Sequence, residues 1–225
     1  AVCWGRNEDG ESSPPAGKFK MVSAGQYFTC AVTSSDSVAC WGLNEWGETN
    51  PPDEAFQHVS VGDGHACGLT TAGQIECWGR DDGGQGTAPA GAFESVAVGA
   101  FHNCGVTTTG TIECWGADDD GQASPPDGSF MSVSAGFRHT CGLNTSGTIE
   151  CWGNNEVNQA SPPDGSFTSI SAGFFHNCGL NEANMVECWG TDVDFSIDET
   201  VGQATPPESE FMSVFAGGFH SCAVD

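Results

Sequence analysis

The sequence predicts an all-β protein, and three features support this: its composition, an internal repeat and a regular cysteine spacing. The 225 residues include 32 Gly, 11 Pro and 12 Cys but only one Tyr, a mixture typical of short strands joined by many turns. Hydrophobic residues make up 38% of the chain, which is enough for a folded core and excludes disorder as the main state. We therefore expect an ordered protein without long helices.

The chain consists of one unit repeated six times. The tripeptide Cys-Trp-Gly recurs with successive copies 37 residues apart. The units begin at Cys3, Cys40, Cys77, Cys114, Cys151 and Cys188. The last unit is longer than the others, because Cys188 and Cys222 are separated by 34 residues where the equivalent interval elsewhere is 27. This places a seven-residue insertion within 191–202, and the repeats predict a single domain over residues 1–225.

The apolar pattern within a unit predicts a β-hairpin. In the fourth unit Cys141 and Leu143 share one face of a strand, a polar turn follows over 144–148, and Ile149 and Cys151 share one face of the next strand. If Leu143 lies opposite Ile149, the two cysteines also lie opposite each other, at a separation that a disulfide accepts. The same ten-residue spacing gives five expected bridges: Cys30–Cys40, Cys67–Cys77, Cys104–Cys114, Cys141–Cys151 and Cys178–Cys188.

A further strand precedes each hairpin and ends in small residues. In the fourth unit it covers 130–136 and has the sequence Phe-Met-Ser-Val-Ser-Ala-Gly. It recurs at 19–25, 56–62, 93–99, 167–173 and 211–217. Three antiparallel strands make a small blade, and blades that bury both faces against their neighbours around an axis form a β-propeller. The six copies therefore predict a six-bladed β-propeller.

The two ends of the chain are expected to complete the sixth blade. Residues 1–5 contain the first Cys-Trp-Gly strand, and the strand ending at 223–225 would be its neighbour. Only Cys3 and Cys222 lack a partner at the ten-residue spacing, so we expect them to bond to each other and close the ring. The alternative is that Cys3 bonds to Cys222 of a second molecule and produces head-to-tail chains.

The charge and the cysteines indicate where such a chain works. Thirty Asp and Glu against five Lys and Arg give a formal net charge of -25, which would repel nucleic acid and anionic lipid. We therefore expect no nucleic-acid partner. With no long apolar run and no leader before Ala1, we expect a soluble or already processed chain without a membrane span. Paired cysteines favour an oxidising compartment, so we expect a secreted or cell-surface, extracellular protein.

Glycine, histidine and Trp-Gly positions recur in the units as Ala135-Gly136-x-x-His139, Gly147, Trp152-Gly153 and the Gly121-Gln122 turn. With these positions, the whole chain resembles the regulator-of-chromosome-condensation (RCC1-like) repeat proteins. The resemblance implies a propeller, commonly of seven blades in that family, in which these positions serve the fold. Short units with paired cysteines look like a secreted, bacterial-type branch rather than the nuclear exchange factor. A secreted β-lactamase inhibitor has a similar propeller, so the resemblance also allows enzyme inhibition.

The loop after the first strand of each unit is the candidate binding site. It differs among otherwise similar copies, and variable loops on a repeated frame commonly bind partners. Exposed aromatic rings there could hold a protein loop or stack on a sugar, although several could instead pack between blades. The candidate residues are Tyr27, Phe101, Phe137, Arg138, Phe174, Phe175 and Phe219.

Motifs for chemistry are weak in this sequence. A histidine lies two residues before a cysteine in five units, at His65, His102, His139, His176 and His220. Because oxidised sulfur is not a metal ligand, we expect these histidines to be structural. Asp118, Asp119 and Asp120 are a weak calcium candidate, for which a solvated acidic rim is the alternative. No catalytic elbow or phosphate loop is recognisable, so we expect no enzyme activity and, calcium aside, no cofactor.

The sequence therefore predicts an extracellular, non-enzymatic binding or structural propeller that mediates protein contact, adhesion or surface assembly. The alternatives are a glycan-binding lectin and an inhibitor of a secreted enzyme. The insertion has Val193, Phe195 and Ile197 at alternate positions and is expected to be a surface excursion that could add a strand to a neighbour. Asn144 begins the only N-glycosylation sequon and is the candidate glycosylation site.

Overall fold

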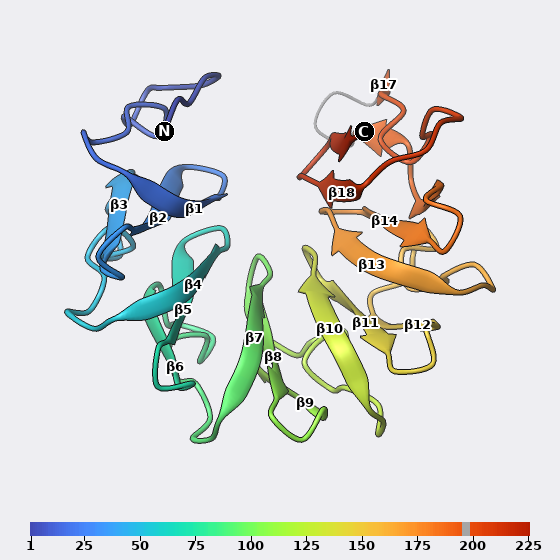
Figure 1. Cartoon of the computed structure of the whole chain (residues 1–225), viewed down its shortest axis with the longest axis horizontal. Coiled ribbons are helices and arrows are strands. Elements are labelled where there is room, and N and C mark those ends of the chain that lie inside the picture. Colours follow the sequence, from blue (N-terminus) through green and yellow to red (C-terminus); the bar gives the residue numbers. More distant parts are fainter. Residues whose placement is uncertain (195–198) are drawn as a thin grey trace.

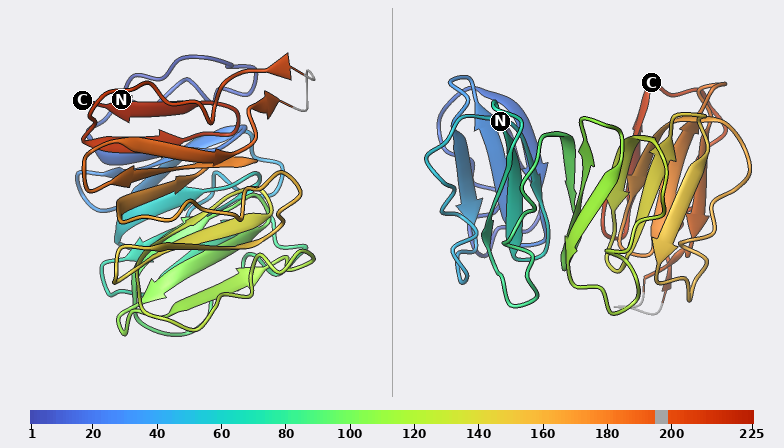
Figure 2. Two further views of the ribbon diagram at one scale, coloured as in Figure 1. Left: turned by 90° about the vertical axis from the view of Figure 1, so that its right-hand side faces the viewer. Right: turned by 90° about the horizontal axis from the view of Figure 1, so that it is seen from below.

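The computed structural model describes residues 1–194 and 199–225, and the regular structure of these residues is entirely β-strand. The strands form five three-stranded sheets and two two-stranded sheets. Figure 1 shows the sheets arranged around a central axis, with a gap between the two ends of the chain. Figure 2 shows the sheets side by side when the ring is viewed from its edge. Nowhere in the described residues is there a helix long and apolar enough to cross a membrane. The predicted all-β fold of repeated antiparallel blades is confirmed.

We number the blades in chain order. Blade 1 consists of β1 (Phe19–Ala24), β2 (Phe28–Thr33) and β3 (Val38–Gly42), and blade 2 of β4 (Phe56–Val61), β5 (His65–Thr70) and β6 (Ile75–Gly79). Blade 3 consists of β7 (Phe93–Val98), β8 (His102–Thr107) and β9 (Ile112–Gly116), and blade 4 of β10 (Phe130–Ala135), β11 (His139–Asn144) and β12 (Ile149–Gly153). Blade 5 consists of β13 (Phe167–Ala172), β14 (His176–Asn181) and β15 (Val186–Gly190), and blade 6 of β18 (Ser213–Ala216) and β19 (Ser221–Val224).

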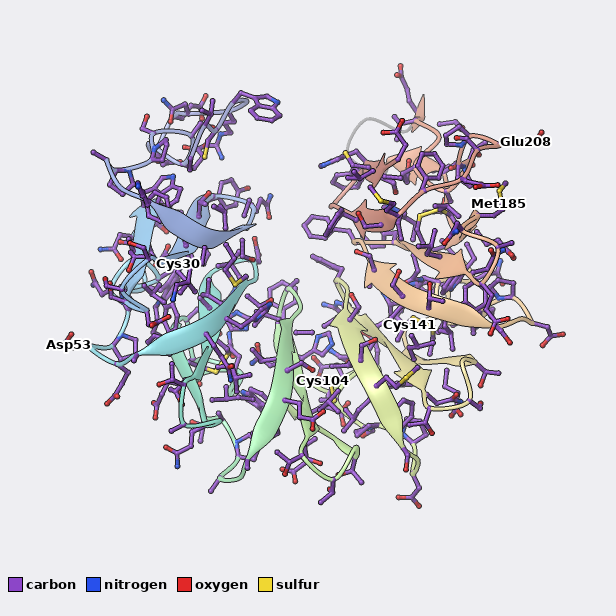
Figure 3. All side chains as sticks on the ribbon, viewed as in Figure 1. Cys30, Asp53, Cys104, Cys141, Met185 and Glu208 are labelled. Carbon is purple, nitrogen blue, oxygen red and sulfur yellow. A yellow bond between two sulfur atoms is a disulfide. The ribbon has the colours of Figure 1, made fainter. Side chains whose placement is uncertain are left out.

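The hairpin register is the one that the sequence predicts. In blade 4 Cys141 lies opposite Cys151 and Leu143 lies opposite Ile149. Each complete blade contains the expected disulfide between its second and third strands, with Cα–Cα distances of 4.0 to 4.1 Å. Figure 3 shows these sulfur–sulfur bonds inside the blades. Each bridge joins directly opposed residues, so it fixes the register of its hairpin.

The hydrophobic core lies between neighbouring blades. Leu69 of blade 2 packs with Val96 and Trp115 of blade 3, for example. The ring of Trp115 also lies 6.5 Å from that of Phe93, centroid to centroid, and its Nε1 donates to the carbonyl oxygen of Gln85 at 3.1 Å. In each of the five complete blades, the tryptophan of the Cys-Trp-Gly motif donates in this way to the loop that enters its own blade, and so ties the outer strand to that loop.

The two ends of the chain differ from the prediction of a closed ring. Within the described residues, β19 pairs with β18 only, and residues 1–5 form no strand. The expected sixth bridge is not formed, because Cys3 and Cys222 are both free. Figure 1 shows the physical reason, which is that the two ends of the chain lie on opposite sides of the gap. The structure therefore has five complete blades and a partial sixth.

The insertion in the last unit forms a short hairpin of its own. In it β16 (Val193–Asp194) pairs with β17 (Glu199–Thr200), which is exposed. Phe195 and Ile197, the other residues of the expected added strand, lie outside the described residues. The surrounding loop keeps its usual contacts, because the Asp192 carboxylate accepts a hydrogen bond from the Ala204 amide at 2.6 Å. The insertion leaves this part of the blade-to-blade connection intact.

Candidate functional site

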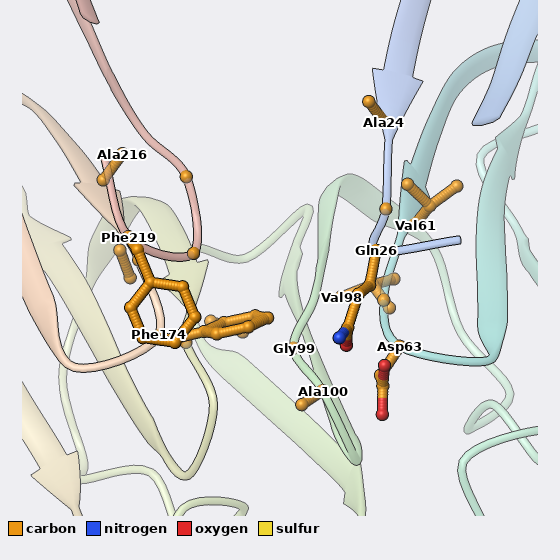
Figure 4. Close-up of a pocket in the computed structure, with 18 of the residues that line it drawn as sticks. Ala24, Gln26, Val61, Asp63, Val98, Gly99, Ala100, Phe174, Ala216 and Phe219 are labelled. Atoms are coloured by element: carbon orange, nitrogen blue, oxygen red, sulfur yellow. The ribbon is translucent and has the colours of Figure 1, made fainter. Parts of the chain in front are cut away.

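The centre of the ring contains a cavity of about 500 Å³, lined by the ends of the first strands and by the loops that follow them (Figure 4). Its wall consists largely of alanine and glycine. A Cβ atom on Gly99 would lie only 2.6 Å from the carbonyl oxygen of Gly136 in the next blade, so glycine is required for the blades to approach this closely. The small residues at the end of each first strand therefore shape the cavity.

The two sides of this cavity differ in chemistry. Figure 4 shows Phe174 and Phe219 on one side, and Gln26 and Asp63 on the other. The two phenylalanine rings meet edge to face with their centroids 5.4 Å apart. Burial raises the pKa of the Asp63 carboxyl above its ordinary value, and the positive charge of Arg80 acts in the opposite direction. The cavity therefore offers an aromatic wall opposite a wall of hydrogen-bonding groups.

Five phenylalanine rings form a continuous series that includes Phe174 and Phe219 of the cavity wall. Phe101 lies 5.3 Å from Phe137, Phe137 lies 5.5 Å from Phe174, and Phe174 lies 5.4 Å from Phe219, centroid to centroid. Phe175 joins the series through Phe137 at 5.4 Å and Phe219 at 6.1 Å. All five are partly exposed. We call these five residues the aromatic belt; the rings come from loops of four consecutive blades.

A cation and a tryptophan extend the aromatic belt at one end. The guanidinium carbon of Arg80 lies 5.6 Å from the ring centroid of Phe101 and 5.7 Å from that of Trp46, which is 57% exposed. Asp82 holds the guanidinium through a 2.6 Å ion pair. Sequence reasoning missed Trp46, although it is the only one of the seven tryptophans outside a Cys-Trp-Gly motif. That difference was the available signal.

The other two predicted site residues have other partners. The guanidinium of Arg6 lies 4.8 Å from the ring centroid of Tyr27, and Gln26 donates to the Tyr27 hydroxyl at 2.7 Å. Arg138 donates to the Asp120 carboxylate at 3.2 Å. The structure thus brings five of the seven predicted residues into one contact series. Gln26 and Asp63, from the same variable loops, also line the cavity, and the structure adds His220.

Four of the five recurring histidines are buried and join neighbouring blades, whereas His220 is exposed. The Nε2 atom of His139 lies 2.8 Å from Oδ1 of Asn177, whose amide nitrogen donates to the carbonyl oxygen of Gln159. Since an amide oxygen only accepts, the hydrogen-bond network assigns the imidazole proton to Nε2. Burial lowers the pKa of His139 to about 4. Equivalent contacts occur at His65, His102 and His176, in agreement with a structural role.

The aspartates of the calcium candidate are engaged in their own loop. Asp118 accepts hydrogen bonds from the Ala123 amide and the Ser124 hydroxyl, both at 2.7 Å, and Asp120 pairs with Arg138. In the part of the chain that the structure describes, no group of three or more His, Cys, Asp or Glu side chains is placed to hold a metal ion. Asp118 and Asp120 thus stabilise the loop and its neighbour.

Asn144 is held within its hairpin turn. Its Oδ1 accepts a hydrogen bond from the Ser146 amide at 3.0 Å, and its Nδ2 donates to the Thr148 hydroxyl at 2.5 Å. Nδ2 also donates to the Glu150 carboxylate at 3.3 Å, and attachment of a sugar would replace one of its two N–H donors. Glycosylation of Asn144 stays a prediction.

Comparison with known proteins identifies the repeat. The family model for the regulator of chromosome condensation (RCC1) repeat matches residues 20–47, 56–85, 93–122 and 132–159. The ectodomain of the Physcomitrella patens receptor kinase CR4 is 29% identical, with a TM-score of 0.78 over 94% of this chain. This chain spans only 59% of that ectodomain. No curated protein matches the chain by sequence.

Two further solved structures are similar. The CRINKLY WD40 ectodomain of the Arabidopsis thaliana receptor kinase ACR4 is 25% identical, with a TM-score of 0.74 over 94% of this chain and 77% of that chain. Yeast RCC1 (Prp20), in its structure with Kap60, is 16% identical, with a TM-score of 0.72 over 90% of this chain and 67% of that chain. At that identity the yeast structure shows the shared fold alone.

Proposed function

This chain belongs to the family of RCC1 repeat proteins, and on that premise we propose that it is an extracellular, non-enzymatic protein-interaction module. The partner is bound at the aromatic belt and in the central cavity beside it. The observation that carries this proposal is the series of five phenylalanine rings, supplied by loops of four consecutive blades and still partly exposed.

The comparisons support protein recognition outside the cell. Both plant matches are ectodomains of receptor kinases. The five disulfides favour an oxidising compartment. These observations favour a secreted or cell-surface module over a cytosolic one. Membership of a bacterial-type branch stays a prediction.

The chemistry of the site indicates the chemistry of the partner. Partly exposed aromatic rings bury a large area with few torsions to immobilise, which is why interfaces are rich in them. The formal net charge of -25 favours a basic partner and speeds its approach. Gln26 and Asp63 face the aromatic wall and can accept hydrogen bonds from a cationic side chain. We therefore propose that the partner presents a basic segment containing an aromatic or large apolar residue.

The proposal includes a ring of six blades. The aromatic belt ends at Phe219 in blade 6, whereas Gln26 lies in blade 1 on the other side of the gap (Figures 1 and 4). A segment held in the cavity would contact both flanks of this gap. Closing the ring would fix the separation of the two flanks and so preorganise the site.

The experiment is a selection of a random phage-displayed peptide library on the immobilised chain, followed by titration of the enriched peptide. We expect enrichment of Lys or Arg next to aromatic residues, and about tenfold or greater loss of affinity in Phe174→Ala and Phe219→Ala. The matched control is Met131→Ala, because Met131 is 52% exposed but lies at the opposite end of its blade. This control should leave the affinity unchanged.

Two results would contradict the proposal. If the affinity of both phenylalanine variants stays the same while their melting temperature falls, the rings are core residues and the site is elsewhere. If no peptide is enriched but a glycan array shows binding that Phe174→Ala abolishes, the aromatic wall serves a lectin. Asp63→Asn tests the partner's charge, because it should lower the affinity for a basic peptide and reduce the salt dependence of binding.

A further inference from the structure

The contact between blades 5 and 6 differs from the other blade contacts in one residue type. Each of the other four interblade core clusters contains a tryptophan from a Cys-Trp-Gly motif. These are Trp78, Trp115, Trp152 and Trp189. The cluster between blades 5 and 6 contains Leu180, Val186 and Val214 but, among the described residues, no tryptophan.

A cavity of about 340 Å³ lies where that tryptophan would be. Val186 of blade 5 and Phe211, Val214 and Ala223 of blade 6 form its apolar walls. Phe211 begins the sixth copy of the repeated first-strand segment, and in the fifth copy the ring of Trp189 packs 6.4 Å from the equivalent phenylalanine. The cavity therefore has the walls of a tryptophan site, and we call it the Trp slot.

The Trp slot also contains the hydrogen-bond acceptor that the tryptophan uses elsewhere. In blade 5, Trp189 Nε1 and Asn177 Nδ2 both donate to the carbonyl oxygen of Gln159, at 3.1 and 2.7 Å. In blade 6, the Ser221 hydroxyl donates to the equivalent carbonyl oxygen of Gln203 at 2.9 Å. Gln203 lines the slot and is only 4% exposed. An indole N–H would give its carbonyl oxygen the second donor that the Gln159 carbonyl oxygen has in blade 5.

The strand beside the Trp slot is open at its outer edge. Within the described residues β19 pairs with β18 alone, so it has backbone groups free to accept another strand. Cys222 is exposed on β19, at the position that Cys178 occupies opposite Cys188 in blade 5. A strand that completes blade 6 would therefore carry a cysteine opposite Cys222, followed by a tryptophan.

Residues 1–5 have this sequence and form no strand in the structure. Their order, Ala-Val-Cys-Trp-Gly, differs from that of β3 only in its first two residues, which are exchanged. Trp4 is 86% exposed, and Cys3 is free. The 13 residues of 6–18 equal in number each of the four linkers between successive complete blades, which are 43–55, 80–92, 117–129 and 154–166. Residues 1–5 thus have the spacing of an outer strand in the blade directly beside blade 1.

We propose that the outer edge of blade 6 is a binding site for a Cys-Trp-Gly strand, and that residues 1–5 of the same chain occupy it. Trp4 enters the Trp slot and donates to the carbonyl oxygen of Gln203, while Cys3 bonds to Cys222. Because linker 6–18 has the length that joins neighbouring blades elsewhere, residues 1–5 of the same chain are present at a high effective concentration beside blade 6. Binding of residues 1–5 to blade 6 closes the ring. This closure does not depend on whether the aromatic belt binds a protein.

Closure is a thiol–disulfide exchange that requires an oxidant, and oxidised glutathione represents the class of small disulfides that can supply it. The Cys222 thiolate attacks oxidised glutathione, forms a mixed disulfide and releases one glutathione thiolate. The Cys3 thiolate then attacks the Cys222 sulfur and releases the second glutathione. Two protein thiols are oxidised and one glutathione disulfide is reduced to two thiols, so the step balances.

The test uses the full 225-residue chain in a glutathione redox buffer, trapped with N-ethylmaleimide before any reduction. We expect an intact mass without maleimide, a Cys3–Cys222 peptide after proteolysis, and a monomer band on non-reducing electrophoresis. Trp4→Ala should lower the equilibrium constant for forming this bond about a hundredfold, because a ring that fills a slot is lost. Trp46→Ala is the matched control: it removes an exposed tryptophan outside the motif and should leave the equilibrium unchanged.

Three results would overturn this inference. Maleimide on both Cys3 and Cys222 after equilibration would show that the strand does not bind. A covalent ladder that collapses on reduction would assign the site to residues 1–5 of a second copy. An unchanged equilibrium in Trp4→Ala would show that the bond forms without the Trp slot. Phe174→Ala should close normally, so failure of the aromatic belt and failure of closure are separate outcomes.

Discussion

Acidification should destabilise this protein through its buried histidines, and His139 allows the effect to be isolated. Its Nε2 atom donates to Asn177, while Nδ1 is buried without a partner. Protonation of Nδ1 would place an uncompensated charge between two blades, and burial accordingly lowers the pKa from 6.5 to about 4. The histidine therefore titrates at a higher pH in the unfolded chain than in the folded one.

The sign and size of the effect follow from this difference. Above pH 6.5 the His139 imidazole is neutral in the folded and the unfolded chain, and its contribution to the free energy of unfolding is fully present. As the pH falls from 6.5 toward 4, the unfolded state gains a proton that the folded state does not, and stability is lost. Between pH 7 and pH 5 the loss for this single group is about 2 kcal/mol.

The assay is guanidinium chloride unfolding at both pH values for the wild type, His139→Gln and His139→Phe. Phe28 occupies the equivalent position in blade 1, so the second variant uses a side chain that this fold already accepts there. Each variant is expected to lose about 2 kcal/mol less than the wild type between pH 7 and pH 5, whatever its absolute stability. The comparison cancels the contribution of the thirty acidic residues. Equal losses in all three proteins would refute the assignment of a depressed pKa to His139.

Three further predictions concern the frame of the ring. Gly99→Ala should lower the free energy of unfolding by about 1 to 3 kcal/mol, because the new Cβ would lie 2.6 Å from the Gly136 carbonyl oxygen. Gly17→Ala is the control and should change the stability little, because the nearest atom to its Cβ is 3.6 Å away. Equal stability of the two variants in chemical unfolding would contradict this prediction. Deletion of 193–199 should leave the melting temperature and circular dichroism spectrum nearly unchanged, because Asp192 keeps its loop contact, and an unfolded product would place the insertion in the core. Mass spectrometry after alkylation without reduction should find the ten hairpin cysteines unlabelled, and labelling of any would remove that bridge from the framework.

The blades could be predicted from the sequence because their determinants are local. A strand has a side-chain period of two, so the pairing of Leu143 with Ile149 brings Cys141 opposite Cys151 without further information. The glycine that follows the first strand recurs in all six copies and fits a crowded centre. Repetition along the chain then gave the architecture.

The closure of the ring could not be predicted in this way. It depends on the small rotation between neighbouring blades, which accumulates over the whole ring and has no local sequence signal. Residues 1–5 have the sequence of an outer strand, yet in the structure they lie apart from β19. The strand motif indicates what can pair, whereas the accumulated rotation decides whether the partners meet.

The part of the candidate site that lies in the repeated loops was predictable, and the part that depends on contacts between blades was not. The aromatic belt lies at one repeated position, so comparison of the copies found it. Trp46 and Arg80 follow the third strands of blades 1 and 2 and meet Phe101 only because neighbouring blades bring different loops together. Asp63 acquires its raised pKa from burial, which the sequence does not show.

The central claim is that a protein partner binds at the mouth of the central cavity, and hydrogen–deuterium exchange tests it most directly. Exchange would be measured with and without the peptide selected on the full chain. The account predicts slower exchange in the loops containing Phe101, Phe137, Phe174 and Phe219, and unchanged exchange at the hairpin turn 144–148 on the opposite end of blade 4. Protection of that turn with an unchanged cavity mouth would contradict it.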